Sequence, residues 1–504
     1  MLSALLAIPF LGALGLMLWP GELSLEKVRR AALALLVLQL AWSLRLLLQF
    51  DPSFGGMQLQ ESIPWIESLG LEYRLGVDGL SLPLVLVNAG LTLVSAYAST
   101  TVTQRPRLYF ALLLVISGAV NGAFLSLNLL LFFLFYELEL IPLWLLISVW
   151  GGARRAYAAT KFLIFTAVSG GLILAAFLGL ALVTGEVDFS LTPVLGGQLA
   201  MGTQLLLLGA LLVGFGIKIP LVPFHTWLPD AHTEASTPVS VLLAGVLLKL
   251  GTYGLLRFCL GLFPEAWAVA APWLAIWAAI SVLYGSLAAI AQRDMKRMVA
   301  YSSVGHMGYV LLAAAAATPV SLLGAEFQMV SHGLISALLF LLVGEVYTTT
   351  GIRDLDVLRG LLNPERGLPL TGSLMIVGVM ASAGLPGMAG FISEFLVFRG
   401  SLATFPVATV ASMVGSGLTA VYFLLLVNRA FFGRLAVTPP EPGGPLDIRL
   451  PAVPLLRHLP AMVLTVLVVA IGLAPSGLGF LSEQATTAMS QLPALVTAIS
   501  GRPA

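Results

Sequence analysis

The chain has 504 residues, of which 59% are hydrophobic and only 10% are charged. Soluble proteins carry about 25% charged residues, so the composition indicates an all-α polytopic membrane protein. The net charge is +1 and the basic residues are scattered between apolar runs, which excludes an electrostatic surface for nucleic acid. The single cysteine, Cys259, permits neither an internal disulfide nor a cysteine metal site.

Apolar windows long enough to cross about 30 Å of hydrocarbon recur along the whole chain. The first of them has neither a basic leader nor a small-residue cleavage site, so we expect a retained span. The polar break at residues 126–128 barely separates the fourth window from the fifth. About fourteen transmembrane helices are predicted, at residues 2–19, 31–50, 80–99, 108–127, 129–150, 162–183, 201–221, 239–262, 266–290, 299–317, 322–347, 368–402, 407–432 and 461–481.

The loop charges give the orientation of these windows. Lysines and arginines gather in the loops after odd-numbered windows, whereas the loops after even-numbered windows hold mostly acids, among them Glu67 and Glu186. Cytoplasmic loops are enriched in Lys and Arg. We therefore expect both termini on the non-cytoplasmic side.

Two of the predicted helices are interrupted. Pro220 lies in IKIPLVP of the seventh window, and Pro386 lies in ASAGLPGMAGFISEF of the twelfth. Proline removes a backbone donor and breaks a helix, and freed backbone at membrane depth needs protein or water around it. The breaks are five spans apart, which suggests two units of five spans each. Because five is an odd number, the second unit would be inverted in the membrane relative to the first, as in inverted-repeat transporters.

The placement of breaks and charges predicts four segments. Residues 1–106 hold the first three helices, 107–262 the first antiporter-like repeat, 263–435 the second, inverted repeat, and 436–504 the last helix with its tail.

Two lysines lie where the sequence should be purely apolar. Lys218 ends the seventh window and Lys249 lies deep in the eighth. A charge at this depth costs about 3 kcal/mol on insertion scales and is tolerated mainly where it faces a wet interior or a partner. Both lysines are candidates for an ion path. The alternative for Lys218 is that it reaches the headgroups from a helix end.

Two glutamates lie in the middle of the fifth window, FFLFYELELIPLWLL. Glu137 and Glu139 are two residues apart, which is a rotation of about 200°, so they cannot share one partner. One is expected to face the bundle interior and the other a neighbouring helix or subunit. We expect Glu137 to face Lys218 at the broken helix; the alternative is that Glu137 only anchors helices.

Two histidines and one further acid lie inside later windows. His306 and His332 can each take and give a proton through the two ring nitrogens. Each could instead be held by a nearby serine without a role in transfer. Glu394 is the acid of the twelfth window, eight residues after Pro386. We assign it to the ion path.

A cluster of polar side chains is expected in a loop after the seventh window. It resembles a metal site only superficially. No tetrahedral spacing is fixed, so we expect hydrogen bonds that hold the loop and no metal. The group consists of His225, Asp230, His232 and Glu234. The chain also has no phosphate-cradling glycine loop and no haem or iron–sulfur ligand set, so it is expected to bind no cofactor.

Several long motifs resemble a known family. They are YELELIPLW, GIKIPLVPFHTWLPDAH, LAGVLLKLGTYGLLRF, RDMKRMVAYSSVGHMG, MVSHGLISALLF and GLPGMAGFISEF. Together they resemble the antiporter-like chain 4 (M/D-type) subunits of complex I. ELELIP followed by YAATKF is most similar to the D subunit of cyanobacterial photosynthetic complex I, an NAD(P)H-quinone oxidoreductase, and AHTEASTPVSVLLAG resembles its carbon dioxide uptake variant.

The resemblance implies fourteen helices with two inverted five-helix repeats, and a non-redox subunit that translocates protons when partner subunits reduce quinone. It implies Glu137 as the charge partner of Lys218, Lys249 and His332 as a central relay, His306 beside them, and Glu394 as the exit-side acid.

The same resemblance implies the setting of the chain. The membrane would be the cyanobacterial thylakoid. The partners would be other membrane subunits of complex I, with plastoquinone and iron–sulfur clusters held by partner subunits. Two other functions stay open: a subunit of a multi-subunit sodium/proton antiporter, and a membrane scaffold for soluble modules.

Overall fold

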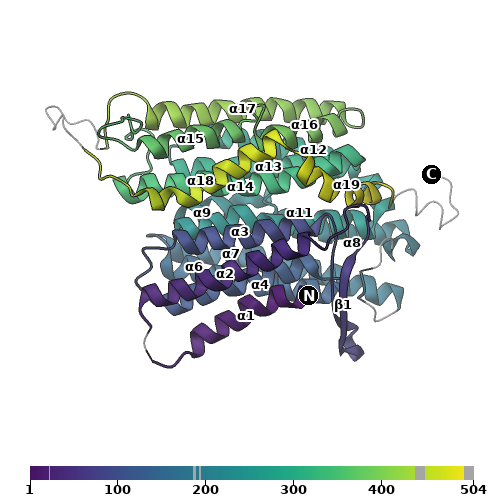
Figure 1. Cartoon of the computed structure of the whole chain (residues 1–504). Coiled ribbons are helices and arrows are strands. Elements are labelled where there is room, and N and C mark those ends of the chain that lie inside the picture. The colour runs from purple at the N-terminus through teal and green to yellow at the C-terminus, as the bar shows by residue number, and fades with distance from the viewer. Residues whose placement is uncertain (22, 186–188, 192–194, 438–448, 493–504) are drawn as a thin grey trace.

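The computed structural model describes residues 1–21, 23–185, 189–191, 195–437 and 449–492. In it the chain forms a bundle of long helices that run roughly side by side (Figure 1). Positions Glu186 and Asp188 of an acidic loop, and parts of the expected C-terminal segment 436–504, lie outside the described residues.

The N-terminal part contains three helices and a two-stranded hairpin. The helices are α1 (Leu2–Leu18), α2 (Leu25–Leu47) and α3 (Ser81–Ala98), and the strands are β1 (Gln58–Ile66) and β2 (Leu71–Val77), joined by the 3-10 turn η1 (Glu67–Leu69).

The next part of the chain begins at α4. Its elements are α4 (Pro106–Leu125), α5 (Leu129–Leu138), α6 (Leu140–Trp150), α7 (Arg155–Thr184), η2 (Leu195–Gln198), α8 (Met201–Lys218), η3 (Phe224–Thr226), α9 (Trp227–Glu234), α10 (Thr237–Leu242), η4 (Leu243–Leu247), α11 (Leu248–Gly254) and η5 (Leu255–Leu260). The turns η4 and η5 are π-helical, so one continuous span runs from Thr237 to Leu260.

The remaining helices complete the bundle. They are α12 (Pro264–Ile290), α13 (Met295–Ala316), α14 (Pro319–Thr350), α15 (Pro369–Ser382), α16 (Ala389–Ser401), α17 (Pro406–Phe431), α18 (Leu455–Leu473) and α19 (Ser476–Ser490).

The predicted membrane spans are present. Among the described residues, 12 spans are long and apolar enough to cross a membrane, with α5 and α6 counted together. Two further predicted windows correspond to α1, which has 17 residues, and to the broken pair α15 and α16, with 14 and 13 residues. The prediction of a multi-pass helical membrane protein with two broken helices is confirmed.

Three local features were not predicted. A β-hairpin follows α2; the polar and apolar residues of β2 largely alternate, and Gly70 turns the chain with φ +62°. The last window is divided, since α18 ends at Leu473 and α19 begins at Ser476. The loop expected after the seventh window contains the short helix α9.

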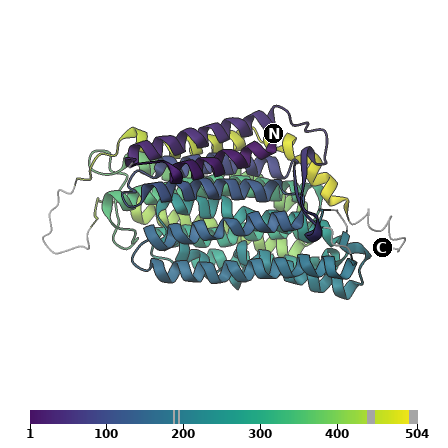
Figure 2. The ribbon, with the colours of Figure 1, turned by 90° about the horizontal axis from the view of Figure 1, so that it is seen from below.

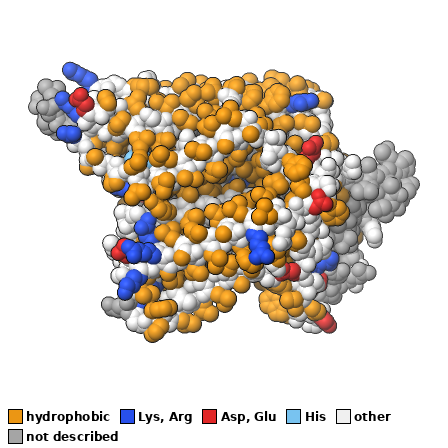
Figure 3. Space-filling model, in the orientation of Figure 1, with side chains coloured by type: hydrophobic (Ala, Val, Ile, Leu, Met, Phe, Trp, Pro, Cys, Tyr) orange, Lys and Arg blue, Asp and Glu red, His pale blue; other side chains and the backbone are white. Residues whose placement is uncertain are grey.

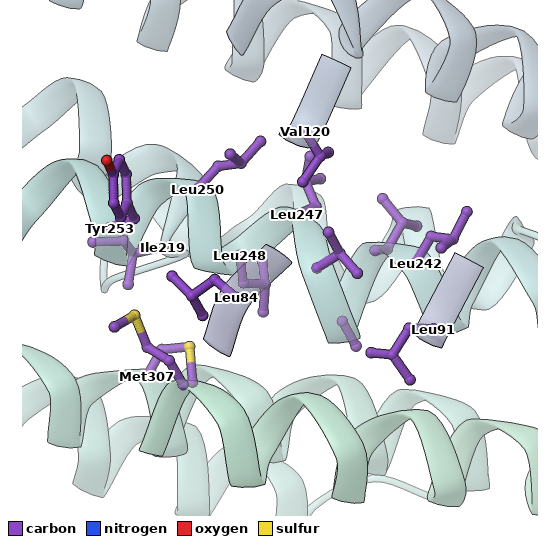
Figure 4. Close-up of a cluster of buried hydrophobic side chains, with 14 of the residues drawn as sticks. Leu84, Leu91, Val120, Ile219, Leu242, Leu247, Leu248, Leu250, Tyr253 and Met307 are labelled. Carbon is purple, nitrogen blue, oxygen red and sulfur yellow. The ribbon is translucent and has the colours of Figure 1, made fainter. Parts of the chain in front are cut away.

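The most enclosed helices lie at the centre of the bundle. In an 18-residue apolar window of the span Thr237–Leu260 every residue is buried; in such windows of α13 and α17 the buried share is 94% and 39%. Figure 4 shows the central span packed between Leu84 of α3, Val120 of α4 and Met307 of α13. Polar side chains on these central helices are therefore shielded from lipid.

The two ends of the bundle differ in charge. Met1, the β-hairpin and α19 lie at one end, as Figures 1 and 2 show from two directions. Blue lysine and arginine side chains gather mainly at the opposite end in Figure 3, while red acids mark the end with Met1. This distribution agrees with the expected placement of Met1 outside the cytoplasm.

Candidate functional site

Lys218 is the last residue of α8 and is held by two partners. Its Nζ forms an ion pair with Oε1 of Glu139, and the side chains are only 1% and 0% exposed. The same Nζ lies 4.5 Å from the centroid of the Tyr136 ring, a cation–π contact. Tyr136 is fixed in turn, because its hydroxyl lies 3.0 Å from Oγ of Ser169 on α7.

The expected contact between Glu137 and Lys218 is wrong. The Glu137 side chain lies against α7 and occupies the space that a Cβ atom at Gly170 would need. Glu139 sits in the turn between α5 and α6, three residues before Pro142. The rotation between the two glutamates separates their partners, and the turn aims Glu139 inward.

Lys249 lies at the start of α11 and is 1% exposed. Its Nζ donates to the carbonyl of Ala244 at 2.7 Å and lies 2.7 Å from Nδ1 of His332. Ala244 belongs to the π-helical turn η4, a widened turn of a kind that is frequent at functional sites. The structure therefore brings together the lysine and the histidine that the sequence placed in the relay.

His306 connects this pair to the second broken helix. The ring centroids of His306 and His332 are 5.6 Å apart, and Nε2 of His306 lies 4.0 Å from Oε1 of Glu394. Oε2 of Glu394 accepts a hydrogen bond of 2.5 Å from Oγ of Ser416 on α17. Four ionisable side chains thus follow one another from α11 through α14 and α13 to α16.

A small cavity lies next to three of these groups. It measures about 10 Å³, room for about one water molecule, and lies between α13, α14, α15 and α16, lined by Ser302, His306, Gln328, Ser331, His332, Ser382 and Glu394 among others. Nε2 of His332 and Nδ1 of His306 are buried and have no hydrogen-bond partner in the protein. A small polar space next to unpaired nitrogens is the setting in which buried water is found.

The two proline breaks lie where they were predicted. Pro220 lies two residues after the end of α8, and Pro386 lies between α15 and α16. Lys218 and Glu394 flank these breaks. The ammonium groups of Lys218 and Lys249 bind other partners and not each other. Their helices are nevertheless in contact, since a Cβ at Gly251 of α11 would lie 3.2 Å from Cβ of Lys218.

The polar group around α9 holds helices together. Asp230 pairs with Nζ of Lys161 at 2.8 Å and with Nη1 of Arg297 at 3.1 Å. Glu234 accepts from the backbone of Arg154 at 2.8 Å, and the His232 ring stacks on Phe340 with centroids 4.4 Å apart. For the two acids the predicted hydrogen-bonding role is confirmed. Within the described residues, no three His, Cys, Asp or Glu side chains are grouped to hold a metal.

Some buried ionisable residues were not predicted, among them Lys296 and Glu326. Lys296, in the loop after the ninth predicted window, is 4% exposed, and its Nζ donates to the carbonyl of Ala235 at 2.5 Å. Glu326 lies in α14 and is 0% exposed. The signal for Glu326 was present, since an acid stands inside the predicted window 322–347.

Comparison with known proteins identifies the family. A family model described as NADH:quinone oxidoreductase/Mrp antiporter, transmembrane, matches residues 126–419. A relative from Thermosynechococcus vestitus, named NAD(P)H-quinone oxidoreductase chain 4 2, is 39% identical over 498 residues, which are 97% of this chain and 92% of the relative. A chain 4 2 protein from Microcystis aeruginosa is 45% identical over 393 residues, 76% of this chain and 70% of that one.

Solved structures give the same fold. A chain of respiratory complex I from Thermus thermophilus superposes with a TM-score of 0.86 at 27% identity, covering 98% of this chain and 100% of that chain. A chain of the Mrp complex from Dietzia sp. shares the fold with a TM-score of 0.84 at 23% identity, covering 99% and 98% of the two chains.

The fold and the buried charges define an antiporter-type membrane subunit. The chain belongs to the NADH:quinone oxidoreductase/Mrp antiporter transmembrane family, and its resemblance to the chain 4 subunits of complex I is confirmed.

Proposed function

We propose that the chain is a proton-translocating membrane subunit of a complex I-type NAD(P)H- or ferredoxin-plastoquinone oxidoreductase. The observation that carries the proposal is the succession of buried ionisable side chains Lys249, His332, His306 and Glu394. Chain 4 relatives of cyanobacteria support the thylakoid membrane as its location.

Each member of the path can hold or pass a proton. Lysine and glutamate exchange one proton each, and a histidine can take a proton on one ring nitrogen and release it from the other. The cavity next to His306 and His332 has room and polar partners for water that would bridge the 5.6 Å between the rings. In this proposal Glu394 is the acid that receives the proton from His306.

In this proposal the ion pair Lys218–Glu139 responds to movement in a neighbouring subunit. A buried ion pair is stable only while both charges are present, and removal of one partner costs about 3–5 kcal/mol. A movement in a neighbouring subunit that draws Glu139 from Lys218 therefore favours transfer of the Lys218 proton inward, toward Lys249. The shared packing of α8 and α11 at Gly251 supports this coupling.

The proposed architecture has two inverted units, residues 107–262 and 263–435. Each unit contains one broken helix, α8 with α9 in the first and α15 with α16 in the second. The relay Lys249–His332 crosses between them, because Lys249 belongs to the first unit and His332 to the second. A path through both units is the arrangement expected where two repeats meet.

The chain itself is proposed to carry no redox group. Plastoquinone and the iron–sulfur clusters would be held by partner subunits, and the outer faces of the bundle would contact other membrane subunits and lipid. Large exposed apolar side chains on outer helices, such as Trp273 of α12 and Val407 of α17, support such contacts.

The test is proton transport by the whole complex in sealed vesicles. Lys218→Ala should abolish most proton uptake while the complex still assembles. Lys27→Ala is the matched control, since Lys27 is exposed near the start of α2. Unchanged uptake in the Lys218 variant would favour the scaffold function instead.

A sodium/proton antiporter subunit is the second candidate. The family includes Mrp antiporters, and the Dietzia chain has the same fold. Transport that depends on sodium at constant pH would favour this function over proton pumping.

A further inference from the structure

Glu326 is a buried carboxyl group that the proposed path does not use. It lies on α14, is 0% exposed, and neither of its oxygens has a hydrogen-bond partner in the protein. A buried polar group without a partner is rare and calls for an explanation, and an ionised carboxylate in such a place is costly. Packing gives no explanation, because an apolar side chain would fill the same position.

The register of α14 places Glu326 on the outlet side of the central relay. A Cβ at Gly333 would lie 3.5 Å from Cε of Lys249, and Oγ1 of Thr252 donates to Sδ of Met329 at 2.9 Å. These two contacts lie one turn apart on both helices. Residues nearer the start of α14 therefore lie beside residues of α11 that come after Lys249. Glu326 is six residues before His332, a rise of about 9 Å.

The next turn of this span carries an ion pair. Nη2 of Arg257 donates to both oxygens of Asp78 at 2.8 and 2.7 Å, and its Nε donates to the Tyr253 hydroxyl at 3.2 Å. Arg257 lies five residues after Thr252 and Glu326 lies three residues before Met329, so both lie on the same side of the Thr252–Met329 contact. Since Asp78 and Arg257 neutralise each other, the three residues together carry a charge of −1 with Glu326 ionised and 0 when it holds a proton.

This group lies near the non-cytoplasmic end of the bundle. Asp78 joins β2 to α3, and its Oδ1 accepts from the backbone of Ser81 at 3.0 Å. Helix α19 covers the site, because a Cβ at Gly79 would lie 3.1 Å from Cα of Ser482. Figure 1 shows α19 at the same end as Met1 and β1.

We propose that Glu326 is a second proton-holding residue, on an outlet that leads from Lys249 past Asp78–Arg257 to the non-cytoplasmic surface under α19. The Lys249 ammonium gives its proton through water to the Glu326 carboxylate, leaving a neutral amine and a neutral carboxylic acid. Glu326 then releases the proton to water beyond Arg257. The inference rests on the proposed function, and it adds an outlet that does not pass through Glu394.

The test compares Glu326→Gln with Glu483→Gln in the whole complex reconstituted in vesicles; Glu483 is an exposed acid on α19. We expect Glu326→Gln to lower the number of protons moved per quinone reduced, and Glu326→Asp to restore part of it. Glu483→Gln should match the unmodified complex. A ratio equal to that of the unmodified complex in Glu326→Gln would overturn the proposal.

A second readout separates proton holding from structure. The infrared spectrum of the working complex should contain a carboxylic acid band that shifts in heavy water and is missing in Glu326→Gln. If the Gln variant does not assemble, the band must move in Glu326→Asp, and an unmoved band overturns the proposal. Lys218→Ala measured in parallel distinguishes the two failures: if it loses transport while Glu326→Gln does not, only the outlet is wrong, and if neither loses transport, the proposed function is wrong as well.

Discussion

Lys218 forms its ion pair with Glu139, while Glu137, two residues earlier on the same span, lies against Gly170 of α7. The pair is enclosed on all sides, with exposed fractions of 1% and 0%. The residue that pairs with the lysine of the broken helix is therefore the second glutamate of the motif YELELIP.

Glu139→Gln should harm proton transport more than Glu137→Gln. Loss of the Glu139 charge leaves the Lys218 ammonium buried without its partner, whereas Glu137 is only intermediate in burial and does not contact Lys218. Initial rates of proton uptake into vesicles measure the difference, with equal assembly checked by the amount of complex recovered. The reverse order would mean that Glu137 reaches Lys218 in the working state.

The sequence predicted most of the fold because every span that crosses lipid must be apolar over its length. Apolar windows gave all the main helices, and the prolines at 220 and 386 located both breaks. The hairpin β1–β2 lies outside the membrane windows, so this requirement did not apply to it. The largely alternating residues of β2 were the available signal.

The pairing within the site could be predicted only in part. Residue type and depth selected Lys249, His332, His306 and Glu394, and the structure places them in succession. Periodicity showed that Glu137 and Glu139 face different ways, but it could not say which faces inward. That choice depends on the turn at Glu139 between α5 and α6, which is a tertiary feature.

Gly285→Ala should disturb the relay through packing alone. A Cβ at Gly285 of α12 would lie 2.5 Å from the backbone nitrogen of Gly305 on α13, so the two helices must separate. Small residues allow such close approach between membrane helices. Because His306 follows Gly305 directly, we expect lower proton transport and a lower melting temperature of the complex.

Gly209→Ala is the control for this packing prediction. A Cβ at Gly209 of α8 would meet nothing within 4 Å. We expect this variant to keep both transport and melting temperature. Equal loss in the two variants would point to a general effect of glycine replacement in these helices.

Single cysteines should establish the orientation. In a Cys259→Ser background, Arg154→Cys should react with a membrane-impermeant maleimide from the cytoplasmic side, and Glu67→Cys from the other side. Both positions are exposed, and they follow the fifth and second predicted windows. Glu67 is chosen among the acids of these loops because the structure describes it. Labelling of both from one side would contradict the arrangement of fourteen spans.

Lys249→Arg should impair proton transport nearly as much as Lys249→Met. Guanidinium keeps the positive charge but does not release its proton at physiological pH, so the Arg variant preserves the charge and removes only the transfer. The position also fits an ammonium group, since Nζ of Lys249 lies 2.7 Å from both the Ala244 carbonyl and Nδ1 of His332. Proton uptake per quinone reduced is the measurement, and Lys27→Arg, at an exposed position of α2, is the control. Full transport in Lys249→Arg would show that a fixed positive charge next to His332 is sufficient and that Lys249 itself passes no proton.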